Sequence, residues 1–308
     1  MAKLFDVLPV VLPVLAALLL GRYARRHQII EERVVSGLKT LVMRFMLPSV
    51  LLGSFYKAEF NRLLVVIALC MFLCCFAGLW LGKAVGKICH VKDSMFPFLT
   101  CGFEAGMMGY GLYAMLFPPS DTHNFALVDL GQVLFVFTVY SALLNKQKGL
   151  STKQTLREMV ASPVFLAIAA GILLSASGLG AFIHQSRAGV SIDAVLNYIG
   201  APTGVLMIFV VGYQLVLNKT GLKAALLTVS VRTVIMAGLC VCCLAVLRQF
   251  FVIPSALFWA IILMFTLPAP FVLPIFCGDE TQESYIATTL SIGTVLSVAY
   301  FTIISFLC

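Results

Sequence analysis

Residues 265–274 read FTLPAPFVLP, and residues 96–112 read FPFLTCGFEAGMMGYGL; both stretches lie inside apolar runs. Pro268, Pro270 and Pro274 remove three amide donors from the first stretch and clash with the preceding helical turn. The second stretch has four glycines in ten residues, and each weakens a helix by about 1 kcal/mol relative to alanine. Two interrupted helices are therefore predicted, although a simple proline kink or close glycine packing would explain either stretch alone.

The chain has too few polar residues to cover a soluble globule. Of its 308 residues, 61% are hydrophobic and 11% are charged, whereas soluble domains carry about 25% charged residues. This composition indicates a polytopic membrane protein and excludes most cytosolic enzyme classes and sequence-specific nucleic-acid binders. The net charge of +8 comes from Lys and Arg in short loops, where basic residues set the topology.

Ten apolar runs are long enough to cross the hydrocarbon core of a bilayer. Each is expected to be helical, because lipid leaves no other way to satisfy the backbone groups of an open chain. The tenth run is rich in Thr and Ser, so nine spans remain an alternative. The expected spans are residues 4–21, 34–55, 62–82, 95–117, 124–144, 160–182, 191–217, 222–248, 255–277 and 284–307.

The basic residues in the loops predict the orientation of these spans. They concentrate after the odd-numbered spans, as with Arg22, Arg25 and Arg26 after the first and Lys83 and Lys87 after the third. Loops rich in Lys and Arg stay in the cytoplasm. We therefore expect a multi-pass protein of the cytoplasmic membrane with both termini outside.

The two halves of the chain share a weak internal pattern. Pro13 and Pro163 each precede a glycine by eight residues, and Pro48 and Pro202 recur in the second span of each half. Five spans followed by five similar spans must have opposite orientations, because five is odd. An all-α inverted repeat is therefore predicted, and such transporters bind substrate where paired helices are broken near mid-membrane. The two units would be residues 1–150 and 151–308.

Glu104 lies among the glycines of the first interrupted segment. A carboxylate at membrane depth is costly and usually functional or paired. Burial makes a carboxyl group easier to protonate, which would allow Glu104 to carry a proton or to contact a substrate. The alternative is a structural ion pair, for which Lys39, Arg44 and Arg232 are the available partners.

Asp129 and Gln132 are three residues apart and would share one face of the fifth span. Gln132 is deeper and is expected to face a cavity, whereas Asp129 would either bind a coupling proton or lie near the membrane interface. No metal site and no Ser/His/Asp triad emerges, so neither an enzyme nor a cofactor-dependent protein is predicted. All four histidines fall in expected loops: His27, His90, His123 and His184.

These patterns resemble the auxin efflux carrier family, which includes the plant PIN transporters and their bacterial relatives. The second span ends FMLPSVLL over residues 45–52, and the sixth begins Ser162-Pro163 where the family has Asn-Pro. Residues 104–112, EAGMMGYGL, align with the family's Asn-x-Gly-Phe-Met-Gly-x-Pro-Leu. The resemblance covers effectively the whole chain, although no single motif is exclusive to the family.

The resemblance implies ten helices in a 5+5 inverted repeat, with helices 4 and 9 crossing at their broken points around an organic anion. Two departures matter, because Glu104 and Gly111 stand where the family has Asn and Pro. A carboxylate in place of the amide would repel an anion unless it were protonated or neutralised by a cation. The expected substrate-binding residues are Glu104, Gly106, Gly109, Gly111, Gln132, Pro268 and Pro270.

We therefore expect a secondary transporter that moves a small organic solute, with a carboxylate favoured, by alternating access. If Glu104 stays charged, a cationic or zwitterionic solute is expected instead. Glu104 and Asp129 would couple transport to a proton, and sodium is the other coupling ion considered. The family implies a homodimer in the bilayer, joined through spans 1, 2, 6 and 7 with kinks at Pro48 and Pro202. The alternative is a membrane sensor or ligand-binding component that uses the same fold without transport.

Overall fold

The computed structural model describes residues 2–57, 62–91, 93–147, 157, 160–216, 221–277 and 279–308. Helices form all of the regular structure in these ranges, with no strand. Seven helices are long and apolar enough to cross a membrane, or eight if one bent pair counts as a single span. The chain is therefore a multi-pass membrane protein. The predicted boundary between two repeat units, at residues 150 and 151, lies outside the described residues.

Seven expected spans are long helices, some with a short π-helical turn or a bend inside them. The Thr-rich tenth span, the weakest of the ten predictions, is one helix of 28 residues. The seven are α1 (Ala2–Arg26); α2 (Glu32–Leu41) with η1 (Val42–Met46) and α3 (Leu47–Phe55); α4 (Arg62–Ile88); α7 (Thr122–Phe135) with η4 (Val136–Tyr140) and α8 (Ser141–Gln147); α12 (Arg187–Gly200) with α13 (Thr203–Gln214); α14 (Leu222–Phe250); and α16 (Glu280–Leu307).

The sixth expected span, residues 160–182, is bent and not straight. Helix α10 (Pro163–Ala176) is followed by α11 (Leu179–Gln185), which runs at 86° to it. Gly178 lies between them with a φ of +75°, a conformation that glycine adopts without steric cost. The signal for the bend was the Ser177-Gly178 pair, a typical turn dipeptide at the end of an otherwise apolar run.

The fourth expected span is interrupted near its middle. Helix α5 (Phe96–Leu99) ends before a non-helical stretch, after which η2 (Ala105–Gly109) continues into α6 (Tyr110–Leu116). Gly102 lies in the gap with a φ of +67°, which favours glycine over any residue with a Cβ. Glu104 is the last residue before the chain becomes helical again.

The ninth expected span is also interrupted. Helix α15 (Ser255–Thr266) ends before an irregular stretch, and only the short helix η5 (Leu273–Phe276) follows it. Pro268 and Pro270 lie in this stretch, where their missing amides and fixed φ angles prevent the helix from continuing.

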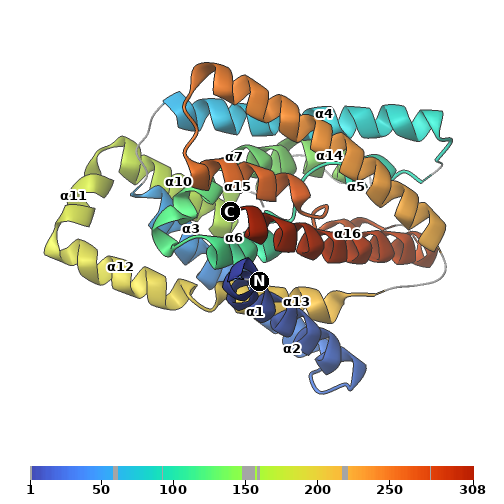
Figure 1. The fold of residues 1–308 in the computed structure, drawn as a ribbon, viewed down its shortest axis with the longest axis horizontal. Helices are drawn as coiled ribbons and strands as arrows, with labels where there is room; N and C mark the ends of the chain where they lie inside the picture. Colours follow the sequence, from blue (N-terminus) through green and yellow to red (C-terminus); the bar gives the residue numbers. More distant parts are fainter. Residues whose placement is uncertain are drawn as a thin grey trace.

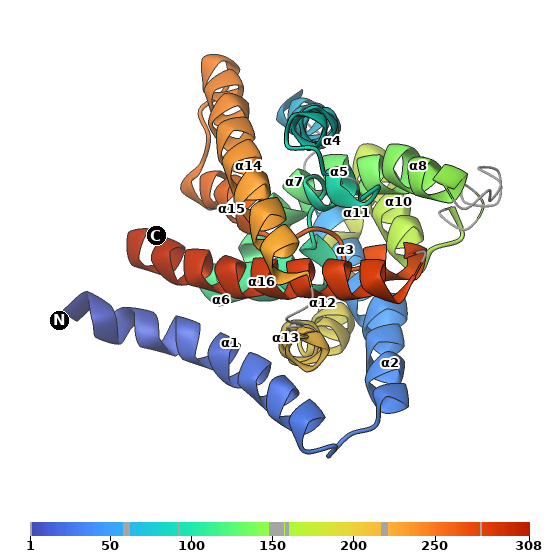
Figure 2. The ribbon, with the colours of Figure 1, turned by 90° about the vertical axis from the view of Figure 1, so that its right-hand side faces the viewer.

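Long helices pack side by side around these two interrupted segments. Helix α4 packs against α7 and α14, and α14 packs against α16 (Figures 1 and 2). Helix α1 packs closely on α13, where a Cβ on Gly21 would lie 2.0 Å from the carbonyl oxygen of Phe209. Both ends of the described chain lie on the same side of the molecule (Figures 1 and 2).

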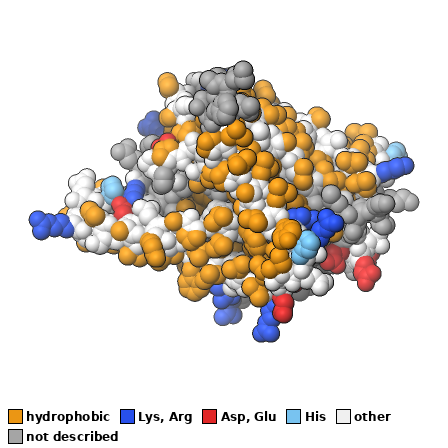
Figure 3. Space-filling view, turned by 60° about the horizontal axis from the view of Figure 1, so that its bottom comes forward, with side chains coloured by type: hydrophobic (Ala, Val, Ile, Leu, Met, Phe, Trp, Pro, Cys, Tyr) orange, Lys and Arg blue, Asp and Glu red, His pale blue; other side chains and the backbone are white. Residues whose placement is uncertain are grey.

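The surface matches the membrane assignment. Apolar side chains cover most of the middle of the face in Figure 3, and charged side chains lie mainly toward its edges. Large exposed residues such as Val234 on α14, 73% exposed, and Leu173 on α10, 69% exposed, have no packing partner that would bury them. Lipid is the environment in which such surfaces are stable.

Candidate functional site

The two interrupted segments contact each other at their non-helical residues. The backbone N–H of Glu104 donates a hydrogen bond to the carbonyl oxygen of Pro268 at 2.9 Å. A Cβ on Gly102 would lie 3.0 Å from Cγ of Pro270. Backbone groups freed by one interruption thus bond to the other, which protects them from lipid.

The side chain of Glu104 bridges the same two segments. Its Oε1 accepts a hydrogen bond from the amide of Met107 at 3.0 Å, and its Oε2 accepts one from the amide of Phe271 at 2.5 Å. Met107 lies in the first turn after the interruption, where helix amides have no helical partner. One carboxylate therefore caps freed amides from both segments.

The alternative of an ion pair for Glu104 is wrong for the described residues. The ion pairs found there all involve Asp193, so neither Lys39, Arg44 nor Arg232 neutralises Glu104 directly. The carboxylate is held instead by amide donors, which stabilise its charge through short, directed bonds. The sequence identified the residue but not this bonding.

Arg232 bonds to backbone carbonyls at both interruptions. This side chain of α14 is 6% exposed, and its guanidinium donates to the carbonyl oxygens of Leu99 at 3.1 Å and Cys101 at 3.3 Å. It also donates to Gly102 at 2.6 Å in the first interruption and to Leu267 at 2.9 Å in the second. The only sequence signal for this role was an arginine inside an apolar span.

Asp129 and Gln132 lie together behind the first interruption, at 4% and 5% exposure. Gln132 Nε2 donates to the carbonyl oxygen of Phe103 at 2.9 Å and to Asp129 Oδ1 at 3.3 Å. The hydroxyl of Tyr110 donates to Asp129 Oδ2 at 3.1 Å. The amide oxygen of Gln132 is buried and has no hydrogen-bond partner among the described residues.

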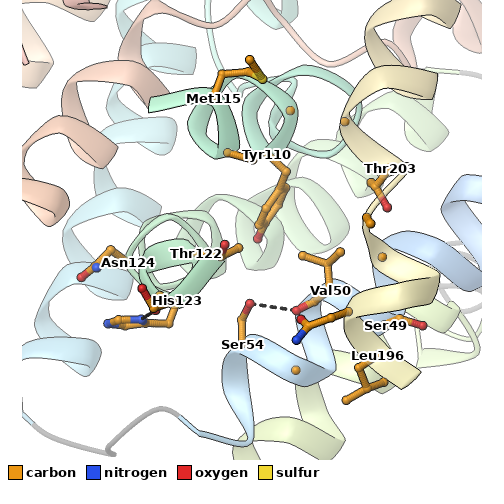
Figure 4. A pocket seen from close by; sticks show the side chains of 18 of the residues that line it. Ser49, Val50, Ser54, Tyr110, Met115, Thr122, His123, Asn124, Leu196 and Thr203 are labelled. Atoms are coloured by element: carbon orange, nitrogen blue, oxygen red, sulfur yellow. Dashed lines mark hydrogen bonds between the residues drawn. The ribbon is translucent and has the colours of Figure 1, made fainter. Parts of the chain in front are cut away.

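A cavity of about 940 Å³ lies beside the second half of the interrupted fourth span. Tyr110 and Gly111 of α6 form part of its wall, and the side chain of Tyr110 extends toward α3 and α7 (Figure 4). Among the described residues, most of the rest of the wall comes from α1, α3, α7, α12, α13 and α15, with Leu63 of α4 and Ser120 before α7 at its edge. The cavity thus separates one group of helices from another.

The predicted binding residues divide between two places. Only Gly111 lines the cavity, where a Cβ on it would lie 3.2 Å from Cα of Gly204 on α13. Gly109 is packed against Phe125 and Leu267 and does not line the cavity, so its contact with a solute stays a prediction. The remaining members lie at or next to the contact between the interruptions: Glu104, Gly106, Gln132, Pro268 and Pro270.

The cavity wall combines apolar side chains with neutral polar groups and carries no acidic residue among those described. Thr203 is 2% exposed, and its hydroxyl has no hydrogen-bond partner among the described residues. Lys57 and His123 supply basic groups. A mostly apolar cavity with a few polar groups is typical of a small-molecule site. Its other polar lining residues are Ser49, Ser54, Ser120, Thr122, Asn124 and Asn197.

A polar cluster adjoins the cavity at Lys57, which follows α3. Lys57 Nζ lies 2.5 Å from Asp193 Oδ1, and His184 Nδ1 lies 3.1 Å from Asp193 Oδ2. Tyr56 also donates a hydrogen bond to Asp193. His184 and His123 were expected in loops but belong to α11 and α7. The sequence could not show that α11, α12 and the end of α3 come together. No described group of three or more His, Cys, Asp or Glu residues could hold a metal ion.

The two predicted scaffold prolines occupy different local structures. Pro48 lies at the start of α3, directly after the π-helical turn Val42–Met46. Pro202 lies between α12 and α13, at the N-cap of α13. Both helix pairs can bend at these points, because proline breaks the ladder of backbone hydrogen bonds.

No protein-family model matches the chain, and no curated protein matches it. The likeness to the auxin efflux carriers therefore rests on the short motifs at residues 45–52, 104–112 and 162–163. Function has to be argued from the chemistry of the site, since a fold alone does not determine it.

Proposed function

We propose that this chain is a secondary transporter that moves a small organic solute across the cytoplasmic membrane by alternating access. The observation that carries the proposal is the direct bonding of two interrupted helices beside a cavity of about 940 Å³. Broken helices that meet inside a membrane protein are the usual site of substrate and ion binding in transporters with inverted repeats.

The packing of the long helices supports a ten-span inverted repeat with units 1–150 and 151–308. Span 1 packs on span 7 through α1 and α13, and span 6 packs on span 2 through α10 and α3. Span 3 packs on span 5 through α4 and α7, and span 8 packs on span 10 through α14 and α16. If spans 1–5 are exchanged with spans 6–10, the contact of spans 1 and 7 becomes that of spans 6 and 2, and the contact of spans 3 and 5 becomes that of spans 8 and 10. The same exchange pairs the interrupted spans 4 and 9, which would cross at Glu104 and Pro268.

The solute class follows from the cavity wall. An anion meets no acidic side chain among the described lining residues, and Lys57, although paired with Asp193, places a basic group at the edge of the cavity. The apolar part of the wall suits an apolar body, and the hydroxyls of Tyr110 and Thr203 suit a polar head. An organic carboxylate with an apolar body is therefore the favoured solute. Glu104 lies outside the cavity wall with its carboxylate bonded by two amides, so it makes no direct contact with a solute there.

Transport would arise from relative movement of the two helix groups that enclose the cavity. Helices α1, α3, α12 and α13 form one group, with Pro48 and Pro202 at its bends, and would make the homodimer contact within the bilayer. Helices α6, α7 and α15 belong to the other group. Tyr110 lines the cavity and bonds to Asp129, so it connects the solute to a protonatable carboxyl group. Asp129 and Glu104 are the groups through which a proton would couple to flux.

Flux into proteoliposomes tests the proposal directly. Purified protein is reconstituted, and uptake of a panel of labelled carboxylates, amino acids and organic cations is measured with and without a pH gradient. Saturable uptake of one or more carboxylates is expected, and Tyr110→Phe should reduce it while the lipid-facing Val234→Ala should not. Binding of a carboxylate without flux under every gradient would favour the non-transporting sensor instead.

A further inference from the structure

Four carbonyl oxygens converge on the guanidinium of Arg232, at 2.6 to 3.3 Å. They belong to Leu99, Cys101 and Gly102 at the first interruption and to Leu267 at the second. Helices α5 and α15 end at these points, and a helix end leaves carbonyls without amide partners and carries partial negative charge. The cluster therefore needs a cation, and no carboxylate among the described residues forms an ion pair with Arg232.

Freed carbonyls at half-helix ends are also the groups that coordinate a coupling sodium ion in secondary transporters with broken helices. Here a side chain supplies the positive charge. The guanidinium is planar, stays charged, and has five N–H donors in a fixed geometry. Its carbon lies 5.6 Å from the centre of the Phe103 ring, so an aromatic face covers it as well.

We propose that Arg232 is a built-in cation that occupies the carbonyl cluster in place of a coupling sodium ion and joins the two interruptions. This inference rests on the proposed transport function for one consequence only, which is that coupling uses a proton and not sodium. The position of Arg232 in the carbonyl cluster does not depend on any solute. Arg232 is a positioning residue, since it acts on backbone carbonyls and not on a solute in the cavity.

Thermal unfolding of the purified protein in detergent tests the inference without a solute. The Tm of the natural chain should be the same in NaCl and in choline chloride at equal ionic strength, because the cation position is filled. Arg232→Ala should lower the Tm by at least about 5 °C, since four charge-assisted bonds are lost. In this variant, millimolar NaCl or guanidinium chloride should raise the Tm in a saturable way, whereas choline chloride should not.

Lys223→Ala is the control, because Lys223 is an exposed residue at the start of the same helix, whereas Arg248 at its other end lies over the ring of Phe258. This control should leave the Tm and its insensitivity to sodium unchanged. A residue that merely packed would lower the Tm when removed but would not create a sodium response, so the absence of that response in Arg232→Ala overturns the proposal. If Arg232→Ala does not fold, the natural chain and Arg232→Lys decide. A saturable, sodium-specific rise in the Tm of the natural chain overturns the proposal. A Tm of the natural chain that does not respond to sodium, together with a folded Arg232→Lys variant, supports it.

The transport proposal fails by a different measurement. Suppose that proteoliposomes show no flux but that Arg232→Ala creates a sodium response. The built-in cation would then stand, and only the conclusion that coupling uses a proton would be lost. Flux that requires sodium in the natural chain would instead keep the transport function and remove the built-in cation.

Discussion

The contact between the interruptions and the neighbouring cavity differ in the groups that their polar side chains bond. At the contact, Glu104 caps freed amides and Arg232 caps freed carbonyls, so the chain satisfies its own broken backbone. In the cavity, the hydroxyls of Ser49 and Ser54 bond within their own helix, whereas the hydroxyl of Thr203 is buried without a partner among the described residues, as is the amide oxygen of Gln132 behind the contact. Polar groups that are already bonded hold a structure together, whereas unbonded ones leave capacity for a ligand. This difference supports the proposal that the contact positions the machinery and that the cavity receives the solute.

The largest effect is expected from removing the carboxylate at the contact. Glu104→Ala leaves the amides of Met107 and Phe271 without their acceptor, which should cost about 2–6 kcal/mol of unfolding free energy. Unfolding in a denaturing detergent titration measures the loss. Glu280→Ala, which removes an exposed carboxylate from the first turn of α16, should cost far less. Equal losses for the two variants would contradict the bridging role of Glu104.

A smaller loss of stability is expected at Gly102. Its φ of +67° and the nearby Pro270 ring leave little room for a Cβ, so Gly102→Ala should lower the unfolding free energy by about 2 kcal/mol. Gly238→Ala is the control, because a Cβ there meets no atom within 4 Å. In the middle of α14 it should be neutral or stabilising. A Gly102→Ala variant as stable as Gly238→Ala would show that the interruption is not held as described.

The cavity should respond in the opposite sense, losing flux but not stability. Thr203→Val removes a hydroxyl that has no partner among the described residues, so the Tm should stay the same or rise slightly. The same change should weaken solute binding by about 1 kcal/mol, or roughly five-fold in the KM for flux. Thr233→Val on α14, whose hydroxyl bonds to the carbonyl of Val229, should leave flux unchanged. A fall in stability without a change in KM would place Thr203 with the structural groups.

The smallest effect is expected at the edge of the cavity. Lys57→Met removes a basic lining group, and the KM for a carboxylate should rise by about two- to five-fold at low salt, with less difference at high salt. Lys223→Met at the exposed start of α14 makes the same charge change away from the cavity. If both variants change the KM alike, the effect is one of net charge and not of the cavity.

The sequence predicted the interruptions because their causes are local. Prolines 268 and 270 and the glycines around residue 102 break a helix wherever it lies, and the apolar runs mark membrane helices by length alone. The bend at Gly178 was missed because single Ser and Gly residues are also tolerated within membrane helices. The positive φ that marks it is a property of the fold.

Long-range bonding within the site could not be predicted in the same way. Arg232 and Leu267 are close only after α14 packs beside the interrupted spans, and Lys57 meets Asp193 only after α3 packs on α12. Composition marked Glu104 and Arg232 as costly inside a membrane but could not show that each binds backbone groups at both interruptions. The position of the cavity likewise depends on how helices from both halves of the chain pack.

The central claim is that the interruptions bond to each other through Glu104 and Arg232 while the solute lies in the cavity. A cryo-electron microscopy structure of the protein in lipid nanodiscs, with a transported carboxylate present, tests it most directly. We predict breaks near residues 102 and 268 in hydrogen-bonding contact and solute density beside Tyr110 and Thr203. Continuous helices through both segments, or solute density between Glu104 and Phe271, would contradict the account.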